Sequence, residues 1–133
     1  MNANITSLNT VRQTYLAGTG HTPYAWGPPD GYPQEFEYWG GLPLPRWNFG
    51  FQLANNSVSG AAVDITALLN GATSATQVAD RIDVLLFAGE MPAADKAALI
   101  TYLRPAGTAT VPSTTQIRDA FGLALSSPAF QWH

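Results

Sequence analysis

Apolar residues recur at spacings of three and four along much of the chain, a pattern that predicts amphipathic helices. Ser74 and Gln77 stand three residues apart and form a capping box ahead of a helix that should end at Gly89. Ser113 and Gln116 repeat the box ahead of a second helix, which Ser127 followed by proline should break. The inward residues are Val78, Ile82, Leu85 and Leu86 in the first helix and Ile117, Ala120, Phe121, Ala124 and Leu125 in the second.

Four further segments carry helical signals. An amphipathic helix of about three turns should run from Leu8 to a stop at Gly18. Asp64 can cap a short helix that Asn70 closes, and Pro92 suits the start of another, which ends at Arg104 because a proline follows. The fourth predicted helix has Pro45 in its first turn. Its apolar stripe consists of Leu44, Trp47, Phe51 and Ala54.

We find no stretch that alternates apolar and polar residues convincingly enough to predict a strand. The predicted fold class is therefore all-α, a compact bundle of about five or six short helices with short connections in its C-terminal half. Residues 1–133 are expected to form a single helical domain, because no linker divides them; residues 105–112 are only a spacer rich in Pro, Gly and Thr.

Composition excludes several classes of function. Only 11% of the residues are charged and the net charge is −3, so the chain lacks the basic stripe that nucleic acid requires. No apolar run reaches the roughly 18 residues of a membrane span. The absence of cysteine excludes thiolate metal sites and a cysteine nucleophile. The weakly charged surface, rich in amides and hydroxyls, favours a secreted or periplasmic location, although this sequence contains no signal peptide.

Residues 18–41 are predicted to form one long loop near the N-terminus, rich in aromatic residues, Pro and Gly, which is unusual in a compact domain unless it is functional or pinned by its own side chains. Its rings offer the flat faces on which sugars stack. The alternative, which we favour for most of the rings, is that they pin the loop. The candidate ligand-binding residues are Trp26, Asp30, Tyr32, Tyr38, Trp39 and Arg46.

Arg46 and Asn48 flank a tryptophan at the start of a predicted helix, where they could hold a ligand carboxylate or phosphate. They could equally bind carbonyl groups of the loop, and we favour that reading. We see no catalytic set, metal site or cofactor site. The loop carboxylates Asp30, Glu35 and Glu37 have no common frame for glycoside hydrolysis, and His21 and His133 have no metal-ligand spacing.

Two motifs go beyond helix patterning. The first is the loop GHTPYAWGPPDGYP followed by YWGGLPLPRWNFGFQLA, and the second is the terminal IRDAFGLALSSPAFQ. Together they resemble the C-terminal portion of a large bacterial family known as domain of unknown function 1800. The matching residues are Gly20, Pro23, Tyr24, Pro28, Pro29, Gly31, Tyr32, Pro33, Trp39, Arg46, Asn48, Phe49, Leu125, Ser127, Pro128, Phe130 and Gln131.

The resemblance spans most of the chain in order and carries implications for function. Members of that family usually are several times longer and often look exported, and Ala129 stands where an acidic residue is frequent in them. The resemblance therefore implies a non-enzymatic helical module that docks on the N-terminal part of such a protein or on a protein partner. The alternative is a carbohydrate-binding module that uses loop 18–41 to bind polysaccharide.

Overall fold

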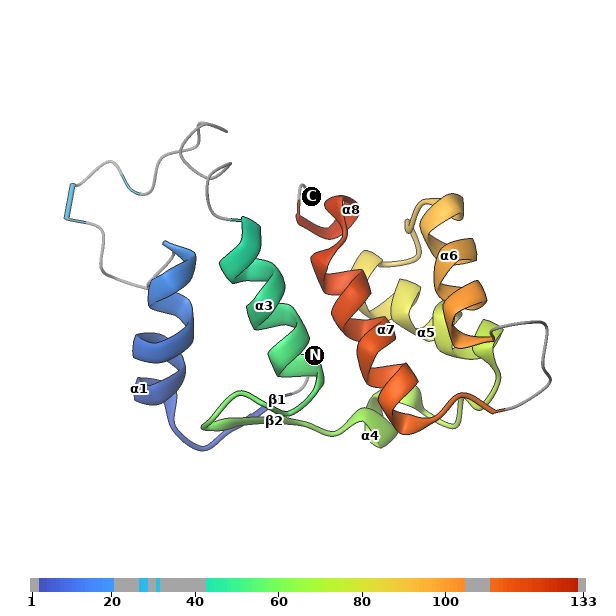
Figure 1. The fold of residues 1–133 in the computed structure, drawn as a ribbon, viewed down its shortest axis with the longest axis horizontal. Helices are drawn as coiled ribbons and strands as arrows, with labels where there is room; N and C mark the ends of the chain where they lie inside the picture. Colours follow the sequence, from blue (N-terminus) through green and yellow to red (C-terminus); the bar gives the residue numbers. More distant parts are fainter. Residues whose placement is uncertain (1–2, 21–26, 29–30, 32–42, 105–110, 132–133) are drawn as a thin grey trace.

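The computed structural model describes residues 3–20, 27–28, 31, 43–104 and 111–131. These residues are mostly helical, with one small antiparallel sheet (Figure 1). The elements are β1 (Ala3–Ile5), α1 (Leu8–Thr10), the π-helical η1 (Val11–Leu16), the 3-10 turn η2 (Ala17–Thr19), α3 (Pro43–Ala54), β2 (Ala61–Val63), α4 (Ile65–Leu69), α5 (Ala75–Phe87), α6 (Ala93–Leu103), α7 (Thr114–Ser126) and α8 (Pro128–Gln131).

The first predicted helix exists but changes type along its length. Ser7 caps α1 by accepting a hydrogen bond from the Thr10 N–H, and the chain then widens into η1 and tightens into η2. The predicted stop at Gly18 was wrong by two residues. Gly20 ends the segment instead, because it takes the left-handed conformation at φ 75°.

The sheet contradicts the prediction that the chain has no strand. β1 pairs antiparallel with β2, with Ala3 opposite Val63. Asn56, itself left-handed at φ 55°, closes the far edge of β2: its side chain accepts from the Val63 N–H at 2.6 Å and donates to the Val63 carbonyl at 3.2 Å. Strands of three residues are too short to show an alternation of apolar and polar residues. The pairing of the two strands and the Asn56 amide stabilise them instead.

The helices of the C-terminal half follow their predicted caps. Both capping boxes form: Ser74 with Gln77 at α5, and Ser113 with Gln116 at α7. Asp64 caps α4 by accepting from a backbone N–H. α7 ends at Ser126, as the predicted break at Ser127 requires. The chain then forms one more short helix, α8, which was not predicted from the sequence.

The core lies between α7 and the helices α5 and α6. Figure 1 shows α3 between the N-terminal helix and α7, with α5 and α6 on the other side of α7. Phe121 of α7 is fully buried, and Val78, Ile82, Leu103 and Val63 surround the same core with at most 1% of their surface exposed. α7 is therefore the central helix, and it packs most extensively against α3.

No helix in the described ranges is long and apolar enough to span a bilayer. The prediction of a mostly helical fold is confirmed. The predicted aromatic loop falls mostly outside the described residues and stays a prediction.

Candidate functional site

Arg46 is the one predicted ligand-binding residue that the described structure contains. It lies half-buried in the first turns of α3, and its neighbour Asn48 is exposed. The other candidates, Trp26, Asp30, Tyr32, Tyr38 and Trp39, lie outside the described residues, as do Glu35, Glu37, His21 and His133. Sugar binding by the loop therefore stays a prediction.

Arg46 lies on the wall of a groove of about 350 Å³. The groove opens where the end of the N-terminal helix, α3, α7 and α8 meet. Among the described residues its lining is mostly aliphatic and aromatic, and it contains no carboxylate. The described lining residues are Leu16, Thr19, Arg46, Phe49, Gly50, Leu53, Leu125, Phe130 and Gln131. We call this the Arg46 groove.

α3 and α7 approach each other closely because glycines lie at their contact. A Cβ atom on Gly122 would meet the Phe51 ring at 2.6 Å, and one on Gly50 would meet the Leu125 Cβ at 3.1 Å. The Ser126 hydroxyl also donates to the Trp47 carbonyl at 3.4 Å. The two helices therefore form one joint surface on their solvent side.

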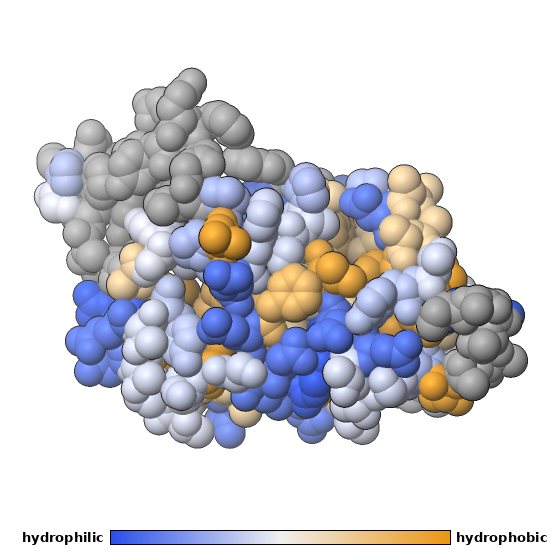
Figure 2. All heavy atoms as spheres, viewed as in Figure 1, coloured by the Kyte–Doolittle hydropathy of each residue, from blue (hydrophilic) through white to orange (hydrophobic). Residues whose placement is uncertain are grey.

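Several large apolar side chains are exposed on that joint surface. Leu44 and Trp47 of α3 are 60% and 39% exposed, and Leu123 of α7 is 40% exposed. Together with Phe51 they define what we call the α3–α7 face. Figure 2 shows apolar residues, in orange, at the middle of this view over α3 and α7. The predicted stripe of α3 is thus a true helix face, but two of its four residues lie at the surface.

A second groove, of about 180 Å³, continues this face toward α6. Leu123 lines it together with Leu99 and Met91, and the carboxylate residue Asp95 is also part of its lining. A further carboxylate, Asp119, follows the same side of α7, since it stands one helical turn before Leu123. The α3–α7 face is therefore flanked by acidic side chains.

Asp119 is held in place by two neighbours. The Asn55 amide donates to one of its oxygens and the Tyr102 hydroxyl to the other, both at 3.2 Å. Partial burial, and then the Asp119 carboxylate, raise the pKa of Tyr102. Because the acceptor oxygens are bound by Asn55, which directly follows α3, and by Tyr102 of α6, this charge has a defined position on the surface.

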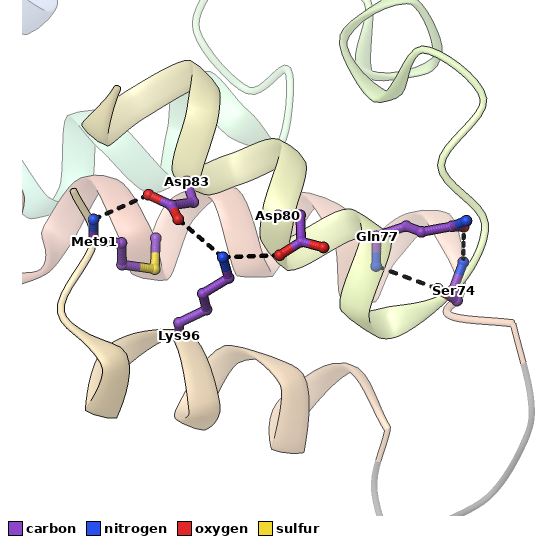
Figure 3. Close-up of polar contacts among 6 residues, drawn as sticks. All are labelled: Ser74, Gln77, Asp80, Asp83, Met91 and Lys96. Atoms are coloured by element: carbon purple, nitrogen blue, oxygen red, sulfur yellow. Dashed lines mark hydrogen bonds and ion pairs between the residues drawn. The ribbon is translucent and has the colours of Figure 1, made fainter. Parts of the chain in front are cut away.

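Asp83 is the buried carboxylate of the described structure, and its partners are structural (Figure 3). It accepts from the Met91 N–H at 3.0 Å and from the Lys96 ammonium at 2.9 Å, and Lys96 also contacts Asp80 at 2.8 Å. Burial alone would raise the pKa of Asp83, but these donors outweigh it and hold that pKa below its usual value. The cluster fastens α6 and the preceding turn to α5.

No group of three or more His, Asp or Glu side chains that could hold a metal ion occurs within the described ranges. The described structure instead presents two largely apolar surfaces on α3. The sequence signal for the α3–α7 face was present in the spacing of Leu44, Trp47 and Phe51, but spacing cannot tell an exposed stripe from a buried one. The Arg46 groove joins residues 16, 46 and 125, which no local pattern connects.

Comparison with known proteins gives the family. No curated protein and no solved structure matches the chain. A family described as "Protein of unknown function (DUF1800)" matches residues 3–132, almost the entire sequence. The terminal motif on α7 and α8 and the motif that continues into α3 fall within that range. The chain therefore belongs to the DUF1800 family.

Proposed function

We propose that this protein is a docking module whose α3–α7 face binds an amphipathic helix of another protein segment. The observation that carries the proposal is the exposure of Leu44, Trp47 and Leu123 on two helices that pack closely together. Helices are commonly recognised in this way, by laying apolar residues at spacings of three and four on an apolar groove.

The charges beside the face specify the partner. Asp95 lines the same groove as Leu123, and Asn55 and Tyr102 hold the Asp119 carboxylate on the same side of α7. A partner helix should therefore carry Lys or Arg beside its apolar stripe, because opposite charges around an interface guide association and suppress wrong partners. In line with the family resemblance, that helix would come from another part of an exported protein or from a separate protein partner.

The test uses two designed helical peptides with the same leucine stripe, one flanked by lysines and the other by glutamates. Each peptide carries a fluorophore, and binding to the full chain is measured by fluorescence anisotropy. We expect the lysine peptide to bind, and we expect binding to weaken as salt rises because the flanking charges are solvent-exposed. The glutamate peptide should bind at least tenfold more weakly.

Substitutions then locate the site. Trp47→Ala combined with Leu123→Ser should weaken binding of the lysine peptide at least tenfold, which corresponds to about 1.4 kcal/mol of binding free energy. The reason is that aromatic anchors which become buried on binding dominate such interfaces. Val84→Ser is the matched control, since Val84 is 58% exposed on α5 and lines a different depression. Equal binding of both peptides, or an equal loss in the Val84→Ser variant, would refute the proposal.

A further inference from the structure

We infer that the partner helix carries two basic residues seven positions apart, with an aliphatic residue between them that enters the groove between α6 and α7. This inference rests on the docking function proposed above and adds the sequence pattern of the partner. The groove is the one of about 180 Å³ that Met91, Leu99 and Leu123 line, which we call the α6–α7 groove.

The size and walls of the α6–α7 groove suit a single apolar side chain. Its volume of about 180 Å³ falls below the roughly 300–1,000 Å³ of sites that enclose a small molecule. Phe87, Met91 and Leu99 are between 6% and 8% exposed and belong to the hydrophobic core, so these walls are in place without a partner. Leu123 is 40% exposed and joins the groove to the α3–α7 face. A helix lying along α7 can therefore bury one aliphatic side chain here.

Two carboxylates lie toward opposite ends of this surface, because α6 and α7 run antiparallel. The Tyr102 hydroxyl of α6 donates to Asp119 of α7. Asp95, seven residues before Tyr102, lines the groove together with Ser127, which follows Asp119 by eight residues. Since a helix rises about 1.5 Å per residue, Asp95 and Asp119 are separated by about 10 Å along the helices, with Leu123 between them.

A partner helix reproduces this spacing on one of its faces. Residues seven positions apart are two turns apart, also about 10 Å, and the residue three or four positions after the first lies between them on the same face. Lys or Arg at the two outer positions can thus face Asp119 and Asp95 while the middle residue enters the groove. Asp119 can accept a further donor, because a carboxylate has about four lone-pair sites and two contacts are already made.

The first test varies the lysine spacing alone. Two fluorescent helical peptides have one composition and one leucine stripe; their two lysines lie seven positions apart around a central leucine in the first and three apart in the second. Fluorescence anisotropy measures binding to the full chain. We expect the first peptide to bind about fivefold more tightly, because the second can place only one lysine on a carboxylate.

Charge reversal tests Asp95. Each lysine of the first peptide is replaced in turn by glutamate, which gives two variant peptides. Asp95→Lys should weaken the original peptide about fivefold and should bind one of the variants, but not the other, more tightly than the unchanged protein does. The variant that is rescued also identifies the direction of the bound helix.

Filling the groove tests the middle residue. Alanine in place of the central leucine of the peptide should weaken binding about tenfold, since less apolar surface is buried. Ala98→Phe places a ring in the groove and should remove this difference between leucine and alanine. Ala97→Phe, at the neighbouring exposed position of α6, should leave the difference unchanged.

The results separate this inference from the docking function. If no peptide binds, or if Trp47→Ala with Leu123→Ser has no effect, both are refuted. If the peptides bind through Trp47 and Leu123 but their affinity does not depend on lysine spacing, the sequence pattern alone is overturned. The same holds if Asp95→Lys rescues neither variant peptide, or if Ala98→Phe and Ala97→Phe behave alike.

Discussion

The helices on the two sides of α7 have apolar stripes of the same period, yet those stripes end in different places. α5 and α6 bury theirs, so that Ile82 and Leu103 are at most 1% exposed. α3 leaves Leu44 and Trp47 at the surface, 60% and 39% exposed. A stripe thus establishes that a helix has an apolar face, whereas the neighbouring elements decide whether that face is covered. This difference underlies our proposal that the exposed stripe of α3 serves recognition.

The largest expected effect on stability comes from the fully buried ring of Phe121, compared with the partly exposed ring of Trp47. Phe121→Ala should lower the free energy of unfolding by about 3–5 kcal/mol, because it removes a fully buried ring and leaves a cavity. Trp47→Ala should cost less, about 1–2 kcal/mol, since 39% of the Trp47 surface is already exposed. Urea unfolding followed by circular dichroism measures both. Similar costs would remove the distinction between the two regions.

The glycine contact between α3 and α7 gives an effect of intermediate size. Gly122→Ala should destabilise the protein by about 1–3 kcal/mol, because the added Cβ would lie 2.6 Å from the Phe51 ring. Gly18→Ala is the control: nothing lies within 4 Å of its Cβ position. Combining Gly122→Ala with Phe51→Ala should reduce the cost of the added methyl group. If the free-energy costs of Gly122→Ala and Phe51→Ala simply add, the absence of a side chain at Gly122 is not what allows the two helices to approach this closely.

The contrast between the two regions also explains which elements could be predicted from the sequence. Capping boxes and apolar stripes are local, so the caps at Ser74 and Ser113 and the buried face of α7 followed from a few neighbouring residues. The sheet did not, because Ala3 pairs with Val63 from far along the chain and each strand has only three residues. α8 was missed because it restarts directly after the break, with the Ser127 hydroxyl accepting from the Phe130 N–H.

The candidate sites show the same division. Arg46 was identified from its residue type and its place at a helix start, and the structure sets it on a groove. The described walls of that groove come from five elements, η1, η2, α3, α7 and α8, so their assembly depends on tertiary packing that periodicity does not encode. The exposure of the α3 stripe likewise depends on where α7 stops covering it. Local chemistry was thus predictable, and its surroundings were not.

The smallest effect concerns how each region responds to acid. In the C-terminal region the Met91 N–H donates to the Asp83 carboxylate, whose pKa is lowered. The stability from this group is present above the usual aspartate pKa, 3.8, and is lost as the pH falls through the lower folded-state value. In the N-terminal region the Val63 N–H donates to Asn56, an amide that does not titrate.

Hydrogen exchange at these two amides separates the regions. As the pH is lowered below about 4, protection of the Met91 amide should fall, after correction for intrinsic exchange, before that of the Val63 amide. Asp83→Asn should remove this pH dependence at Met91, because an amide replaces the titrating carboxylate. Parallel loss of protection at both amides would instead mean that acid unfolds the protein as one unit, so that the two sides of α7 differ in exposure but not in how they are held together.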